Sequence, residues 1–214
     1  MTTEIRNQKT ETGKFSSISD IRHPTSGLRG FTLIETLVAI TIITIAVSGP
    51  LFTASRAIVA AQIARDQLTA SYLAQEGIEY VRAMRDNEYL SAYQASGLNV
   101  STAAWNNFLA GSINQCRGSI CTLDPSKPMD SGNDMSLAPC SGSCAPLHLT
   151  QLSNGTYGYT QQSGGTVTHF IRTIQVIDAS PSGATDVRVI SKVSWDFHNT
   201  PYSISISDHL TPWQ

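Results

Sequence analysis

The sequence has few charged side chains and no strongly basic region. Asp, Glu, Lys and Arg make up only 14% of the 214 residues, and the formal net charge is −2. Ser, Thr, Gly and Asn are plentiful, which is more typical of an extracellular surface than of a cytosolic enzyme. Because no patch of Lys and Arg is large enough to neutralise a row of phosphates, the sequence gives no strong signal for nucleic-acid binding.

The sequence also lacks a recognisable catalytic constellation. It contains no phosphate-binding loop, no Ser-His-Asp arrangement and no paired-carboxylate pattern. None of the five histidines has a partner at metal-ligand spacing; they are His23, His148, His169, His198 and His209. The sequence therefore predicts neither enzymatic activity nor a cofactor.

The longest uncharged run is the most informative segment. From Phe31 to Phe52 the only ionisable side chain is Glu35. A helix of this length rises about 33 Å, which matches the hydrocarbon core of a bilayer of about 30 Å. Hydroxyl side chains fit such a helix because they can bond to carbonyl groups of the preceding turn. A carboxylate inside such a span is costly unless it is paired, so Glu35 is predicted to be functional.

The residues around this acid resemble a known processing site. Arg29-Gly30-Phe31-Thr32-Leu33-Ile34-Glu35 is similar to the N-terminal motif of type IV prepilins and type II secretion pseudopilins. The resemblance implies that a membrane prepilin peptidase cuts between Gly30 and Phe31 and that the new amine of Phe31 is methylated. It further implies that Glu35 pairs with the N-terminal amine of a neighbouring subunit. In a low-dielectric setting such a pair can fix the register between subunits.

The charge distribution predicts the membrane topology. Residues 1–30 carry five basic and three acidic side chains, whereas residues 31–214 carry nine and thirteen. The positive-inside rule then keeps the N-terminus in the cytoplasm and sends the C-terminus outside. We expect residues 1–30 to be a cytoplasmic leader that is cleaved, and residues 31–52 to span the cytoplasmic membrane and later form the filament core. At thirty residues the leader is long for this family.

A second helical segment follows the apolar run. Gly49-Pro50 is expected to loosen or kink the helix, since proline removes one backbone hydrogen bond. Residues 53–89 are then predicted to continue as an amphipathic helix that enters the head and ends between Asn87 and Tyr89. Its expected packing stripe comprises Ala57, Ala61, Ala64, Leu68, Tyr72, Ile78, Val81 and Met84. A dimeric coiled coil is the alternative use of this stripe.

Residues 90–150 form a variable, cysteine-containing region. A short amphipathic helix is expected around Trp105, and a long irregular loop after Cys116, where Pro, Gly, Ser and Asp are frequent. The four cysteines are Cys116, Cys121, Cys140 and Cys144. Two disulfides are favoured by the predicted external location, with three possible pairings, and a four-thiolate zinc site is the alternative.

The same region contains carboxylates that suit calcium. Asp124, Asp130 and Asp134 are the candidate ligands, but their order matches no known calcium loop, so a solvated turn is the favoured interpretation. No metal is therefore predicted.

From residue 151 to 214 the pattern changes to a period of two. A weak strand is predicted at 156–162, and three firmer strands begin near Phe170, Val187 and Tyr202. The short turns between them predict antiparallel hairpins. One face of this sheet is expected to pack on the amphipathic helix. The predicted fold class is thus α+β and pilin-like, with a long N-terminal helix whose second half packs on a C-terminal antiparallel sheet.

These features predict a structural subunit, and specifically a minor pilin of a type IV pilus-like filament. The alternatives are a pseudopilin of a secretion or DNA-uptake machine and a membrane-anchored surface domain that does not polymerise. The expected partners are other pilin subunits, the prepilin peptidase and methylase, a membrane assembly platform and, before assembly, membrane lipid. The expected location is the cytoplasmic membrane, followed by an extracellular pilus or a periplasmic pseudopilus.

Overall fold

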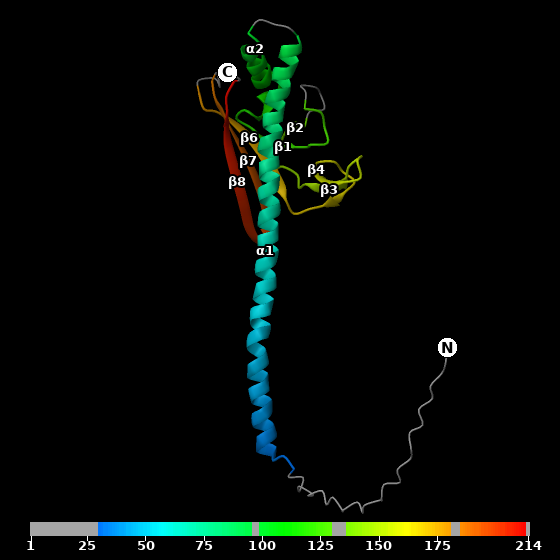
Figure 1. Cartoon of the computed structure of the whole chain (residues 1–214), viewed down its shortest axis with the longest axis vertical. Helices are drawn as coiled ribbons and strands as arrows, with labels where there is room; N and C mark the ends of the chain where they lie inside the picture. Colours follow the sequence, from blue (N-terminus) through cyan, green and yellow to red (C-terminus); the bar gives the residue numbers. More distant parts are fainter. Residues whose placement is uncertain (1–29, 96–98, 130–135, 181–184, 213–214) are drawn as a thin grey trace, which may run out of the picture. The chain divides into compact units, whose positions relative to one another are not determined.

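A computed structural model describes residues 30–95, 99–129, 136–180 and 185–212. The chain divides into two compact units, Met1–Leu51 and Phe52–Gln214. A long N-terminal α-helix, α1 (Leu33–Gln94), is followed by short helices and antiparallel sheets (Figure 1). The predicted α+β, pilin-like architecture is therefore confirmed.

Helix α1 is longer than predicted and is assigned as one continuous helix. It includes Gly49 and Pro50, so the structure shows no interruption of α1 at this pair; loosening there during assembly stays a prediction. It ends at Gln94 rather than between Asn87 and Tyr89. The predicted end was wrong because the next helix breaker along the chain is Gly97, and nothing before it favours termination.

The buried face of α1 is only partly the predicted one. Ile78, Val81 and Met84 are buried as expected, but the other five residues of the predicted stripe are exposed: Ala57, Ala61, Ala64, Leu68 and Tyr72. The whole buried face consists of Ala70, Leu73, Ala74, Gly77, Ile78, Val81 and Met84. The sheet therefore covers α1 only from Ala70 onward, and it covers Leu73 and Ala74 where the predicted stripe had Tyr72.

This face of α1 packs on a five-stranded antiparallel sheet of order β2-β1-β6-β7-β8. The predicted strands correspond to β6 (Ile171–Asp178), β7 (Val187–Phe197) and β8 (Thr200–Leu210). Burial alternates along β7 as the period-two pattern predicts, with Val187, Val189, Ser191, Val193 and Trp195 on the inner face. Trp195 and its cross-strand partner Tyr202 stack at 5.7 Å between ring centroids.

Residues 90–150 are more ordered than predicted. The expected amphipathic helix is present as α2 (Val100–Asn107) and the π-helical turn η1 (Phe108–Ser112), followed by a 3₁₀ turn, η2 (Asn114–Cys116). The expectation of a long irregular loop after Cys116 was partly wrong, since β1 (Ile120–Leu123) and β2 (Leu137–Pro139) belong to the main sheet. Strands of three or four residues give too short an alternation to be recognised from sequence.

A second, smaller sheet has the order β4-β3-β5. Its strands are β3 (His148–Gln151), β4 (Tyr157–Thr160) and β5 (Thr166–Val167), and β4 is the weak strand predicted at 156–162. Tyr159 of β4 contacts Phe170 edge-on at 6.2 Å between ring centroids, which connects the small sheet to the core.

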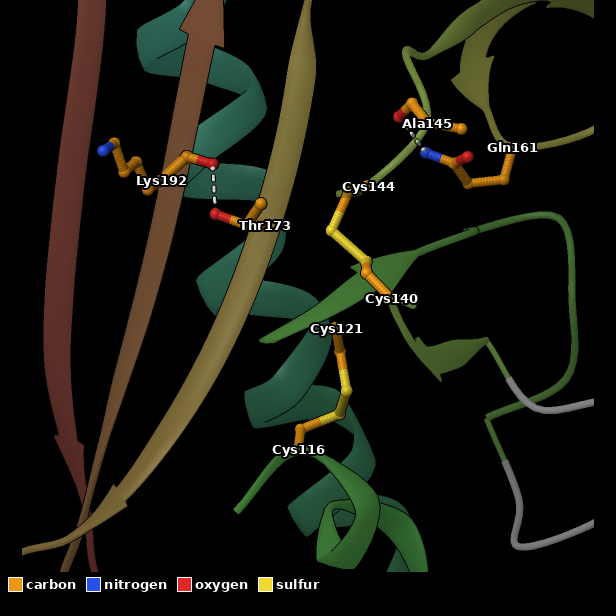
Figure 2. The surroundings of a disulfide bond; sticks show 8 residues. All are labelled: Cys116, Cys121, Cys140, Cys144, Ala145, Gln161, Thr173 and Lys192. Carbon is orange, nitrogen blue, oxygen red and sulfur yellow. Dashed lines mark hydrogen bonds between the residues drawn. A yellow bond between two sulfur atoms is a disulfide. The ribbon is translucent and has the colours of Figure 1, made fainter. Parts of the chain in front are cut away.

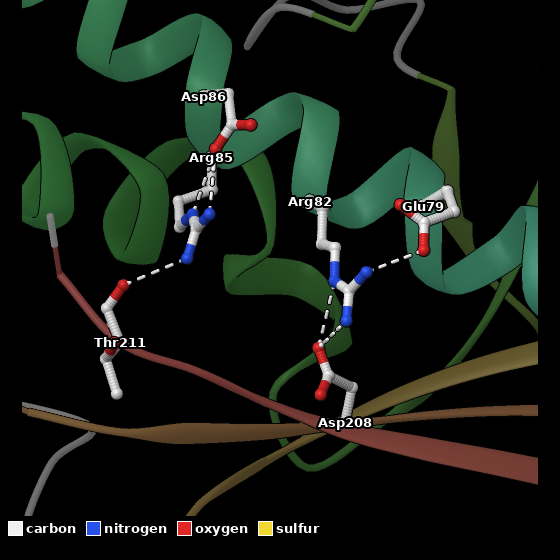
Figure 3. Close-up of polar contacts among 6 residues, drawn as sticks. All are labelled: Glu79, Arg82, Arg85, Asp86, Asp208 and Thr211. Atoms are coloured by element: carbon white, nitrogen blue, oxygen red, sulfur yellow. Dashed lines mark hydrogen bonds and ion pairs between the residues drawn. The ribbon is translucent and has the colours of Figure 1, made fainter.

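Arginines on α1 hold the edge strand β8 (Figure 3). Arg82 donates to Asp208 from Nε at 3.0 Å and from Nη2 at 2.8 Å, and it also pairs with Glu79. These hydrogen bonds to Asp208 raise the pKa of Arg82 above its ordinary value. Asp86 pairs with Arg85, whose Nη1 also donates to the carbonyl of Thr211 at 3.2 Å.

Helix and sheet approach each other closely at Gly77. A Cβ atom there would lie 2.8 Å from Ile174 Cδ1 and closer still to Ser191 Oγ, both on the sheet. These distances are shorter than real Cβ contacts, so a larger residue requires the side chains of Ser191 and Ile174, or the helix itself, to shift. The absence of a side chain at Gly77 thus permits this close packing.

We therefore expect Gly77→Ala to lower the free energy of unfolding by about 1–3 kcal/mol through overpacking. The measurement is denaturant unfolding of the full chain in detergent, monitored by tryptophan fluorescence. Gly49→Ala is the matched control, because nothing lies within 4 Å of a Cβ at that helical glycine. Equal midpoints for Gly77→Ala and the unmodified chain would contradict the assigned packing.

Candidate functional site at the N-terminus

The candidate site lies at the beginning of α1. Gly30 and Phe31 precede the helix, and the Phe31 side chain is 79% exposed. Thr32 caps the helix, since its Oγ1 accepts a hydrogen bond from the backbone N–H of Glu35 at 3.3 Å. This Thr-x-x-Glu spacing is that of a capping box, a signal present in the sequence that the sequence analysis overlooked. The cap gives the segment after the proposed cut a defined helical start.

Glu35 occupies the first turn of α1, where a negative charge interacts favourably with the helix dipole. In the described part of the chain no side chain pairs with its carboxylate. Apolar depressions of about 350 and 450 Å³ adjoin it, one lined with Ile34, Val38, Ala39 and Ile42 and the other with Phe31, Thr36, Ala39 and Ile40. The carboxylate therefore lies within an apolar surface that can be covered by other apolar side chains.

The rest of the segment meets the requirements of a membrane span. Its hydroxyl groups bond back to the helix as predicted: Thr36 to Leu33 at 2.8 Å and Thr41 to Val38 at 2.8 Å, for example. An 18-residue window in α1 has a mean hydropathy of 2.1, and none of it is buried within the protein. By length and composition α1 can cross a membrane, and an apolar N-terminal helix of this kind indicates membrane anchoring.

The four cysteines lie in the other unit and form two disulfides (Figure 2). Cys116 bonds to Cys121 and Cys140 to Cys144, which selects one of the three pairings that the sequence left open. The alternative of a four-thiolate zinc site is wrong for this structure, since all four sulfur atoms are in disulfides. The Cys116–Cys121 bridge is fully buried and joins η2 to β1 within the main core.

Of the three calcium candidates, only Asp124 lies among the described residues. Asp124 is buried, and its Oδ1 accepts hydrogen bonds from the N–H and the hydroxyl of Ser126 at 3.1 and 2.7 Å. This is a turn-stabilising arrangement, but it is buried, so the favoured interpretation of a solvated turn is wrong for Asp124. Asp130 and Asp134 lie outside the described residues. Within the described ranges no group of three or more His, Cys, Asp or Glu side chains could hold a metal ion.

Sequence reasoning also missed an ion pair that joins a buried arginine of the sheet to a partly exposed glutamate of the helix. Arg172 of β6 is fully buried, and it pairs with Glu76 of α1 and donates to the carbonyl of Leu123 at 3.0 Å. Burial lowers the pKa of Arg172 from its ordinary value, and the carboxylate of Glu76 opposes that shift. The period-two pattern placed Arg172 on the same face as Ile174, but nothing in the sequence identified its partner.

The comparisons with known proteins identify the N-terminal segment. Residues 27–49 match the family model of the prokaryotic N-terminal methylation motif, which is the signature of type IV pilins and pseudopilins. No curated protein and no solved structure matches the chain. The match confirms the resemblance seen in the sequence: the N-terminal segment carries the motif of pilins and pseudopilins, and it supports a pilin-like or pseudopilin protein. Proteins with this motif are structural rather than enzymatic.

For the buried disulfide, we expect Cys116→Ser with Cys121→Ser to lower the free energy of unfolding by about 2–4 kcal/mol. The Cys140→Ser, Cys144→Ser chain is the matched comparison and should lose less, because Cys140 is only half-buried and lies outside the main core. Thermal unfolding of both chains with and without reductant measures the difference. Identical melting of the unmodified chain with and without reductant would refute a stabilising role.

For the buried ion pair, we expect Glu76→Gln to destabilise the chain by about 1–3 kcal/mol, because the buried guanidinium of Arg172 loses its counter-ion. Glu79→Gln is the matched control on the same helix, since Glu79 is 65% exposed and an exposed pair contributes little. Denaturant midpoints of the two variants test this. A larger loss for Glu79→Gln than for Glu76→Gln would contradict the role assigned to the buried pair.

Proposed function

We propose that the mature chain begins at Phe31 and is a structural subunit of a type IV pilus-like filament. The observation that carries this proposal is the methylation motif at residues 27–49, followed directly by a capped, membrane-length helix with one acid in its first turn. The prepilin peptidase and methylase act on Gly30 and Phe31. The leader stays in the cytoplasm, and the domain from residue 52 onward lies outside.

Glu35 has a specific role in this proposal. Before assembly the helix is surrounded by lipid, where an unpaired carboxylate is costly. The amine of Phe31 in a neighbouring subunit offers an opposite charge at the same depth, so pairing removes the cost for both groups. The charge pair thus favours one axial position of an incoming subunit over others, while the uncharged remainder of the segment up to Phe52 contributes apolar contact.

Within this class, we propose a minor pilin delivered through a membrane assembly platform. The disulfide-containing region between Cys116 and Cys144 supports the minor role. The methylation motif is shared with pseudopilins, so a subunit of a type II secretion or DNA-uptake pseudopilus is the second candidate. Two measurements distinguish a minor pilin from a pseudopilin: the number of copies per filament and the identity of the machinery that assembly requires.

We expect Glu35→Gln to leave membrane insertion and processing unchanged but to prevent incorporation into filaments, because it removes the charge and keeps the shape. Cell fractionation measures insertion, and immunoblots of sheared filaments measure incorporation. Thr36→Ala is the matched control on the next residue. Normal incorporation of Glu35→Gln would contradict the charge-pair account, whereas absence of the unmodified chain from filaments would favour a membrane-anchored domain that does not polymerise.

A further inference from the structure

An apolar groove lies where α1 meets the small sheet. It has a volume of about 370 Å³ and is lined with Thr69, Tyr72, Leu73 and Glu76 of α1 and Tyr159 of β4. Leu73 is buried, whereas Tyr72 is 69% exposed. The groove adjoins the part of the predicted packing stripe that the sheet leaves uncovered. An exposed apolar surface of this kind marks an interaction site.

The groove has a single acidic group, Glu76. Its Oε2 pairs with Nη1 of the buried Arg172, and the side chain remains 42% exposed. Oε1 has no hydrogen-bond partner among the residues that the structure describes. A carboxylate accepts more than one donor, so Glu76 can still receive a cation. A fitting ligand therefore presents an apolar group to Tyr72 and a basic group to Glu76, one helical turn apart.

The same helix carries this combination twenty residues earlier. Phe52 is 61% exposed, and Arg56, one turn further on, holds its guanidinium carbon 5.2 Å from the centre of the Phe52 ring. We propose that the groove of one copy of the chain receives Phe52 and Arg56 of a second copy. Phe52 then packs on Tyr72 and Tyr159, and Arg56 pairs with Glu76. This inference rests on the proposed function, because it requires neighbouring copies.

The geometry of α1 determines what such contacts build. Subunits anchored in one membrane have parallel helices, and the twenty-residue offset displaces neighbouring copies by about 30 Å along the axis. Twenty residues also correspond to a rotation of about 200° around the helix, so Phe52 and the groove face nearly opposite sides. One copy can therefore bind two neighbours at once. The contact is heterologous and does not pair two copies symmetrically, so it can repeat along an open assembly.

Cysteine cross-linking in filaments tests the contact. The full chain with Phe52→Cys and Tyr72→Cys is expressed in its native host, and sheared filaments are oxidised and run on non-reducing gels. Residues 52 and 72 lie about 30 Å apart along one helix, too far for a disulfide within a chain. We expect disulfide-linked dimers, and higher multimers where more copies are adjacent, whose linked peptides contain residues 52 and 72. Phe52→Cys with Tyr157→Cys is the control, since Tyr157 is 68% exposed but outside the groove, and it should give no linked species.

Charge reversal provides a second test that needs no added cysteine. Arg56→Glu should reduce incorporation about tenfold or more, because it places two carboxylates together, whereas Arg56→Lys should retain it. Arg188→Glu is the control, since Arg188 is exposed on the outer face of the sheet. Unchanged incorporation of Arg56→Glu would overturn the proposal. The proposal would also be overturned if, in filaments of the Phe52→Cys, Tyr72→Cys chain, the cysteine at position 52 formed no disulfide or formed one only with a different protein. Absence of the unmodified, processed protein from all filaments would overturn both this contact and the proposed function.

Discussion

One carboxylate at the start of an otherwise uncharged, membrane-length segment is the constraint on which the account depends. Glu35 lies in the first turn of α1, between apolar depressions, and no described side chain pairs with it. Water can solvate such a carboxylate and hydrocarbon cannot, so an apolar setting favours pairing of Glu35 with a cation from another chain. In the proposed function, the free amine created by cutting before Phe31 is that cation. Processing and assembly are then linked through one electrostatic interaction.

The unit that begins at Phe52 depends on a different constraint, the close contact of α1 with the main sheet. Small residues on the helix, Gly77 above all, allow the sheet to approach, and the buried Arg172 is held by Glu76 and a backbone carbonyl. The Cys116–Cys121 bridge fixes the start of β1 inside the same core. Glu76 has two consequences, because it neutralises a buried arginine and also supplies the acidic group of the groove beside Tyr72. Glu76 therefore contributes both to the stability of this unit and to its proposed contact with a second copy.

Structural features that depend on local sequence patterns could be predicted, whereas those that depend on tertiary contacts could not. The membrane-length run, the motif around Gly30 and the alternation in β6 to β8 are patterns along the chain, and each was recognised. The short strands β1 and β2 gave too little alternation to be seen. Leu68 and Tyr72 were assigned to the core, although the sheet covers the neighbouring face that contains Leu73. The disulfide pairing and the Arg172–Glu76 pair join residues through the fold, so spacing in the sequence could not select them. The capping box at Thr32 was visible in the sequence and was overlooked.

The central claim is that the chain is processed as a prepilin before Phe31. The most direct measurement is the intact mass, with the N-terminal peptide, of the protein recovered from its native host. The account predicts a chain that begins at Phe31 and carries one additional methyl group on its amine. It also predicts that Gly30→Leu, which puts a bulky side chain at the cleavage position, accumulates unprocessed. A chain that begins at Met1, or normal processing of Gly30→Leu, would contradict the claim.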